Sequence, residues 1–145
     1  MEAGAREIGA NNDGPFVEKY HGFEADHAWC AAFVSWCFEE ACRRSGISMP
    51  FKRSGSAKAL FRNVTRAGSR SDFPKVGAVV AWNRGGNASS WKGHIGLVSS
   101  VGQNGTFHAI EGNVGSFRRT AGRVREIEHR VDDQQLLGFA TLEER

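Results

Sequence analysis

Residues 29–38 read WCAAFVSWCF and place a cysteine, Cys30, at the front of an otherwise apolar helix. A helix N-terminus carries partial positive charge and free backbone N–H groups. These features stabilise a thiolate and can also hold an oxyanion. The position of Cys30 therefore predicts a catalytic nucleophile.

The same stretch belongs to a longer amphipathic helix. We expect Asp26 as its N-cap, an end near Arg44 and a stop at Ser45-Gly46. Its apolar positions follow the i, i+3, i+4, i+7, i+8 template, so one face should be buried: 30, 33, 34, 37, 38 and 41. Cys37 and Cys42 are predicted core residues of this helix. The cysteine spacings match neither C-x-x-C nor a zinc knuckle, which indicates free thiols and no metal site.

The composition is that of a globular protein. The chain has 145 residues, of which 40% are hydrophobic and 24% charged, with a formal net charge of +3. We expect a single domain over residues 1–145 that favours an anionic partner. No apolar run approaches the roughly 20 residues of a membrane span, and the first six residues lack the apolar segment of a signal peptide. These patterns predict cytoplasmic synthesis without a signal peptide and no stable membrane insertion.

Predicted helices precede predicted strands along the chain. Short helices are expected near 2–8 and 16–20, and a longer one over 56–68. After Pro74 the sequence changes to short β-rich runs separated by glycine turns: 77–82, 94–101, 106–111, 123–129 and 137–140. Gln103-Asn104-Gly105 is typical of a hairpin turn. This order predicts an α+β domain, with N-terminal helices packed on an antiparallel β-sheet.

A cysteine nucleophile needs a base and a group that orients the base. His94 opens a strong strand, and its imidazole can project from the strand end toward a helix N-terminus. Glu111 ends the next strand, where the predicted hairpin would put it beside His94; Asn113 offers an amide that can assist. His108 competes with Glu111 as the orienting group. Because alternation puts 108 and 111 on opposite faces, only one of them can face His94.

The other aromatic and imidazole residues receive weaker assignments. Trp82 and Trp91 lie near strand ends, where they either line a substrate groove or pack in the core; with Trp29 they are our candidates for substrate binding. His21 and His27 are expected in loops. His129 falls in a charged, edge-like segment, and no role is predicted for it.

Three motifs together resemble a known family. Trp29-Cys30-Ala31-Ala32-Phe33-Val34, then Gly93-His94-Ile95-Gly96-Leu97-Val98, then Ile110-Glu111-Gly112-Asn113 resemble, in this order, the CHAP family of cysteine, histidine-dependent amidohydrolases and peptidases. The resemblance covers about positions 1–140. It implies a papain-like α+β fold, with the catalytic cysteine at a helix N-terminus. It further implies peptidoglycan as the substrate and catalysis by Cys30 and His94 with Glu111, assisted by Asn113.

The resemblance also shapes the expected partners. The closely spaced aspartates of some calcium-binding CHAP lysins are missing before Cys30, so we expect no metal and no cofactor. A compact, basic enzyme resembles a phage endolysin or a secreted antibacterial amidase effector. Such a protein acts on the cell wall or in the periplasm after release or export. We expect a monomer whose partner is bacterial peptidoglycan rather than nucleic acid.

Two other interpretations are open at this point. An NlpC/P60-type endopeptidase shares the fold and commonly uses a histidine as third residue, which would promote His108. A non-catalytic wall-binding module would keep the fold without the chemistry. Within the CHAP interpretation, the cleaved bond is either the sugar-to-L-alanine amide of an N-acetylmuramoyl-L-alanine amidase or a peptide bond in the stem or crossbridge.

Overall fold

The computed structural model describes residues 30–84, 87, 89–90, 92–114 and 123–142, without the side chains of 113, 114 and 123. Two helices in this part of the chain, α2 (Cys30–Ser45) and α3 (Ala57–Ala67), precede all the strands. The strands are β1 (Gly68–Ser71), β2 (Val79–Asn83), β3 (Gly93–Val101), β4 (Thr106–Val114), β5 (Arg123–Arg130) and β6 (Leu136–Leu142). The predicted helices near 2–8 and 16–20 and the Asp26 cap lie outside the described residues.

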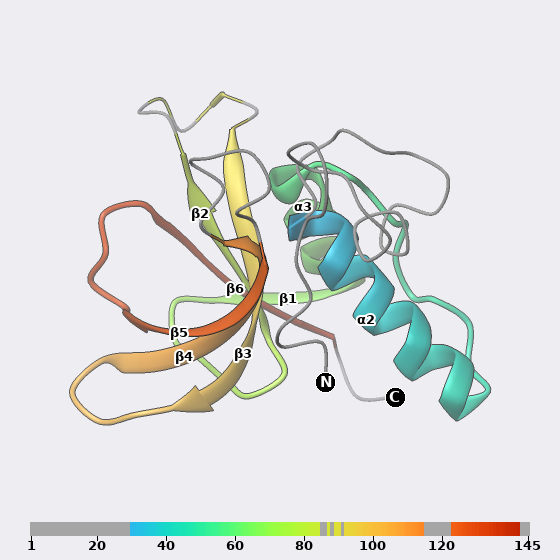
Figure 1. Ribbon diagram of the computed structural model, residues 1–145. Helices are drawn as coiled ribbons and strands as arrows, with labels where there is room; N and C mark the ends of the chain where they lie inside the picture. The colour runs from blue at the N-terminus through green and yellow to red at the C-terminus, as the bar shows by residue number, and fades with distance from the viewer. Residues whose placement is uncertain (1–29, 85–86, 88, 91, 115–122, 143–145) are drawn as a thin grey trace.

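The described strands form one sheet in the order β1-β6-β2-β3-β4-β5, and all of its strand pairs are antiparallel. Figure 1 shows both helices on one face of the sheet, while β4 and β5 curve away on the other side. Two helices packed on a six-stranded antiparallel sheet make an α+β fold, as the sequence predicted.

Local sequence explains where the two helices end. After α2, Gly46 adopts a left-handed φ of 68°, and the Ile47 N–H bonds the Cys42 carbonyl at 3.0 Å. This is the Schellman arrangement, which glycine favours because it has no Cβ. At the start of α3, the Ser56 side chain accepts a hydrogen bond from the Ala59 N–H.

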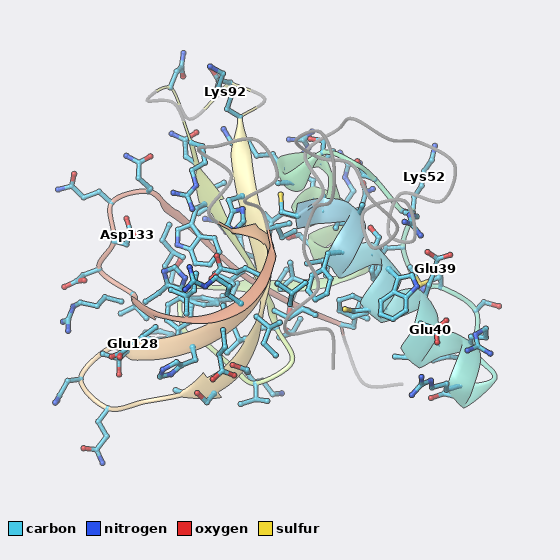
Figure 2. All side chains as sticks on the ribbon, in the orientation of Figure 1. Glu39, Glu40, Lys52, Lys92, Glu128 and Asp133 are labelled. Atoms are coloured by element: carbon cyan, nitrogen blue, oxygen red, sulfur yellow. The ribbon has the colours of Figure 1, made fainter. Side chains whose placement is uncertain are left out.

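The core is divided between the two faces of the sheet. The helix-facing cluster joins α2 and α3 to alternate strand residues such as Val79, Ala81 and Ile95. The other cluster contains the residues between them, including Trp82, Phe107 and Phe139. The charged side chains of Glu39, Lys52 and Asp133 lie at the periphery in Figure 2, whereas Glu111 is buried. Because successive strand residues point to opposite faces, each face of the sheet has its own buried cluster.

One turn fixes the relation of β3 to β4. Asn104 and Gly105 both have positive φ, 58° and 76°, and the Thr106 N–H bonds the Gln103 carbonyl at 3.3 Å. Positive φ at both central residues is the type I′ geometry that matches the twist of a hairpin. The hairpin predicted at this turn is confirmed, and it brings the starts of the Gly93 and Glu111 motifs onto neighbouring strands.

The structure differs from the sequence prediction at β1. The helix predicted over 56–68 ends at Ala67, and Gly68–Ser71, for which no strand was predicted, pairs with β6 from Gly68↔Leu142 to Ser71↔Phe139. Its sequence, GSRS, has no apolar alternation, so local pattern gave no signal.

The expectations of one domain over residues 1–145 and of a monomer stay predictions. No helix among the described residues is both long and apolar enough to cross a bilayer.

Candidate active site

Cys30 occupies the first residue of α2, and its side chain is buried at 5% exposure. Its thiol hydrogen-bonds the His94 side chain and the backbone N–H groups of Ala31 and Ile95. Burial raises the pKa of the thiol, but the hydrogen bond and positive charge of His94, aided by the two N–H groups, outweigh it. The net effect holds the pKa of Cys30 below its usual value, as a nucleophilic thiolate requires.

His94 is the second residue of β3 and the register partner of Trp82 on β2. Its Nε2 lies 2.7 Å from Oε1 of Glu111, which leaves Nδ1 to face the Cys30 thiol. Burial lowers the pKa of His94, but the hydrogen bonds and charges of Cys30 and Glu111 raise it to about 9. The lowered pKa of Cys30 and the raised pKa of His94 both favour the form of the pair in which a thiolate faces an imidazolium.

Glu111 lies on β4, and its carboxylate is the most buried ionisable group of the cluster at 1% residue exposure. Burial raises the pKa of Glu111, while hydrogen bonds and positive charge from His129 and His94 bring it below its usual value. Gly96 leaves the space that this side chain fills, because a Cβ at residue 96 would lie 2.7 Å from Glu111 Cγ. The second glycine of the Gly-His-Ile-Gly motif is therefore needed because a side chain there would clash with Glu111.

The structure adds one residue that the sequence did not indicate. His129, near the end of β5, places its Nε2 2.6 Å from Oε2 of Glu111. The expectation that His129 has no evident role is therefore wrong as regards contact with the site. Its neighbours Glu128 and Arg130 are exposed and gave the segment its edge-like appearance, whereas His129 itself turns inward. Because successive side chains of a strand point to opposite faces, strand periodicity along 123–130 could have shown that His129 faces away from Glu128 and Arg130.

The other predicted site residues are placed as follows. Of the two alternatives for Trp82, a substrate groove or the core, the structure shows the core: it is 2% exposed and packs against the rings of His94, Phe107 and His129. Its place among the candidates for substrate binding is therefore corrected, and it supports the two imidazoles instead. The backbone of Asn113 belongs to β4. Its side chain, together with Trp29 and Trp91, lies outside the described residues, as do His21 and His27.

Glu111 rather than His108 contacts Nε2 of His94. His108 pairs with Ser100 on one side and Glu128 on the other in the strand register. Residue 108 lies between Phe107 and Ala109 and therefore faces the opposite side of β4. Phe107 and Ala109 belong to the same buried cluster as Trp82. The alternation argument from the sequence predicted only that one of the two residues could face His94, and the strand pairing makes Glu111 that residue.

A cavity of about 450 Å³ lies one helical turn beyond Cys30, between α2 and the strands β3 and β4. Its walls are almost wholly apolar and include Phe33, Cys37, Phe38, Leu97 and Ile110. It contains none of the titratable groups that meet at Cys30, so we place the chemistry at the start of α2 and not in this cavity. Among the described residues, no group of three or more His, Cys, Asp or Glu side chains could hold a metal ion.

Comparison with known proteins assigns the family. No curated protein and no solved structure matches the chain. The family model of the CHAP domain matches residues 22–113, which is more than half of the chain and includes Cys30, His94 and Glu111. CHAP domains are typically cysteine- and histidine-dependent amidohydrolases, and membership supports a general role as a peptidoglycan amidase or peptidase that acts on the cell wall. With a buried cysteine, histidine and glutamate in contact at the start of a helix, this chain belongs to the CHAP domain family.

Proposed function

We propose that the protein hydrolyses an amide bond of bacterial peptidoglycan, with Cys30 as nucleophile, His94 as acid and base and Glu111 as the orienting group. The observation that carries the proposal is the continuous series of contacts from the Cys30 thiol through His94 to Glu111. The lowered pKa of Cys30 and the raised pKa of His94 support it further, because together they describe a nucleophile and an acid at the same pH.

The reaction is a two-step acyl transfer. The Cys30 thiolate attacks the carbonyl carbon, a C–S bond forms, and the carbonyl electron pair moves onto oxygen. The His94 imidazolium gives its proton to the amide nitrogen, the C–N bond breaks and the amine leaves. Neutral His94 then takes a proton from water as the water attacks the thioester, and the C–S bond breaks to restore the thiolate and the imidazolium.

The surroundings of Cys30 supply charge stabilisation. The first backbone N–H groups of a helix have no acceptor within the helix, so the Cys30 N–H at the start of α2 is available to an oxyanion. Glu111 keeps Nε2 of His94 protonated and stabilises the imidazolium, which leaves Nδ1 to exchange protons with the reacting groups. Asn113, which follows Glu111 by two residues, is the proposed assistant of this task.

The net charge of +3 suits an enzyme whose substrate lies in an anionic envelope. A phage endolysin and a secreted antibacterial amidase both need this property, and the proposal covers both. Because exposed charges are screened over about 8 Å at physiological salt, the electrostatic part of wall affinity should weaken as salt is raised.

Digestion of purified peptidoglycan tests the proposal. Wild-type protein, Cys30→Ala and the matched control Cys37→Ala are incubated with walls of several chemotypes, and the released fragments are identified by mass spectrometry. We expect fragments with wild type and Cys37→Ala and none with Cys30→Ala. A new amino terminus on L-alanine indicates the amidase reaction, whereas one within the stem or crossbridge indicates an endopeptidase. Absence of any Cys30-dependent fragment from all walls would contradict the hydrolase proposal.

A further inference from the structure

Glu111 is bridged by two imidazoles in the structure. Oε1 lies 2.7 Å from His94 Nε2, and Oε2 lies 2.6 Å from His129 Nε2. We propose that His129 is a positioning residue for the reaction: it donates its Nε2–H to Oε2 of Glu111 and so fixes the carboxylate with Oε1 directed at His94. This inference rests on the proposed function, because the reaction that it serves is the one assigned to Cys30 and His94.

Aromatic packing fixes the ring of His129 in the orientation that this role needs. The ring lies 4.5 Å from the ring of Trp82 and 5.6 Å from that of Phe107, its register partner on β4. Trp82 also packs 5.7 Å from His94, so one indole supports both imidazoles. Two neighbouring rings restrict rotation of the imidazole, and Nε2 therefore remains directed at Glu111.

The proton on this hydrogen bond is assigned by chemistry. An ionised carboxylate can only accept hydrogen bonds, so His129 carries its proton on Nε2. A buried carboxylate oxygen without a donor is costly, because burial removes the water that would otherwise solvate it. Hydrogen bonds from His129 and His94 together offset the burial that raises the pKa of Glu111. Each imidazole therefore solvates one oxygen of the carboxylate.

The second donor matters during turnover. When His94 gives its Nδ1 proton to the leaving amine, the imidazolium becomes neutral and its attraction for Glu111 decreases. His129 does not take part in that transfer, so its hydrogen bond to Oε2 persists and Glu111 stays in place. The orienting group is thus held by a partner that the reaction does not alter.

Few described ionisable groups can contribute to a pH effect at Glu111. His94 on β3 and His129 on β5 bond it directly, and Cys30 on α2 acts through His94. Arg125 is its register partner on β5 and is exposed. From β2 the neighbouring ring is the uncharged Trp82, which packs on both histidines.

Two substitutions separate positioning from packing. His129→Gln keeps an N–H donor near the place of Nε2, whereas His129→Leu keeps bulk and removes the donor. We expect His129→Leu to lower the rate of wall digestion about tenfold. We also expect the acid limb of its pH profile to move up by roughly one pH unit. Glu111 without one of its two hydrogen bonds stabilises the His94 imidazolium less, and the Cys30 thiolate that this imidazolium favours is then stabilised less as well. His129→Gln should return the limb to near the wild-type position.

A second measurement does not depend on the wall substrate. Iodoacetamide alkylates thiolates, so its rate of reaction with Cys30, followed by peptide mass spectrometry across pH, reports the Cys30–His94 ion pair. The profile of His129→Leu should move to higher pH and that of His129→Gln should not. If wall digestion fails for every variant but this pattern is seen, the proposed function is wrong while the role of His129 stands.

Thermal unfolding of each variant checks that it folds. Equal profiles for wild type, His129→Leu and His129→Gln, with only a lower midpoint of unfolding, would show that His129 merely packs and would overturn the proposal. Should His129→Leu fail to fold, His129→Asn replaces it, because its amide is one carbon shorter than that of Gln and does not reach Glu111. Equal profiles for the Asn and Gln variants would overturn the proposal in the same way.

Discussion

The first turn of α2 and the turns that follow it carry the same residue type in different surroundings. Cys30 is 5% exposed and Cys42 7%, so the two thiols are buried to a similar degree. Cys30 meets His94 and two backbone N–H groups, whereas Cys42 packs in the core and Cys37 lines an apolar cavity. Burial by itself makes a thiol inert, and hydrogen-bond donors directed at the sulfur make it a candidate nucleophile.

The largest expected effect is that of removing the Cys30 thiol. Cys30→Ala should lower wall digestion by about 10⁴-fold or more, because no other group can form the acyl intermediate. Clearing of a suspension of purified peptidoglycan measures the rate. Cys37→Ala, about two helical turns away from Cys30, should digest walls close to the wild-type rate. A Cys30→Ala protein that keeps full activity would favour the non-catalytic wall-binding module.

Removing the charge of the orienting group should have the next largest effect. Glu111→Gln keeps the shape of the side chain but stabilises the imidazolium less, and we expect a loss of about 10³-fold. His108→Ala is the matched control, since His108 lies on the same strand but off the face of Glu111. The two rates are compared in one assay. Loss of turnover in His108→Ala but not in Glu111→Gln would name His108 as the orienting group and favour the NlpC/P60-type mechanism.

The ion pair predicts a bell-shaped dependence of the rate on pH. His94 must be protonated to release the amine, so activity should fall above about pH 9, its raised pKa. Cys30 must be ionised, and because its pKa is lowered, the acid limb should lie below the ordinary thiol range. Beyond either limb the rate should change about tenfold per pH unit. A rate that rises through pH 9 and beyond would mean that the thiol ionises independently of His94.

The smallest expected effect concerns the packing of Cys42. Cys42→Ala removes a buried sulfur from the core and should lower the free energy of unfolding by about 1 kcal/mol. Urea unfolding followed by circular dichroism measures this change, and wall digestion below the unfolding transition should keep its wild-type rate. A large loss of digestion rate without loss of stability would show that Cys42 takes part in the site.

Several parts of the fold could be predicted because their signals are local. The helix that contains Cys30, the helix expected from Ser56 and the Asn104-Gly105 turn each depend on residues within a few positions of one another. The predicted apolar stripe of α2 is only partly right, because residues 30–35 are buried on all sides and Ala41 is exposed. Strand β1 could not be predicted, because its polar sequence is strand only through pairing with β6, about 70 residues later in the chain.

The candidate site divides in the same way. The sequence by itself determined that Cys30 would lie near the start of a helix and that residues 108 and 111 would face opposite sides of their strand, since helix and strand periodicity are properties of neighbouring residues. Strand pairing in the tertiary structure decided that Glu111 is the one that faces His94. Only the tertiary structure decided that Gly96 would make room for Glu111 and that His129 would reach its second oxygen. These contacts depend on strand register and on the β-bulges in β3 and β4, and such long-range pairing is not encoded in any single segment.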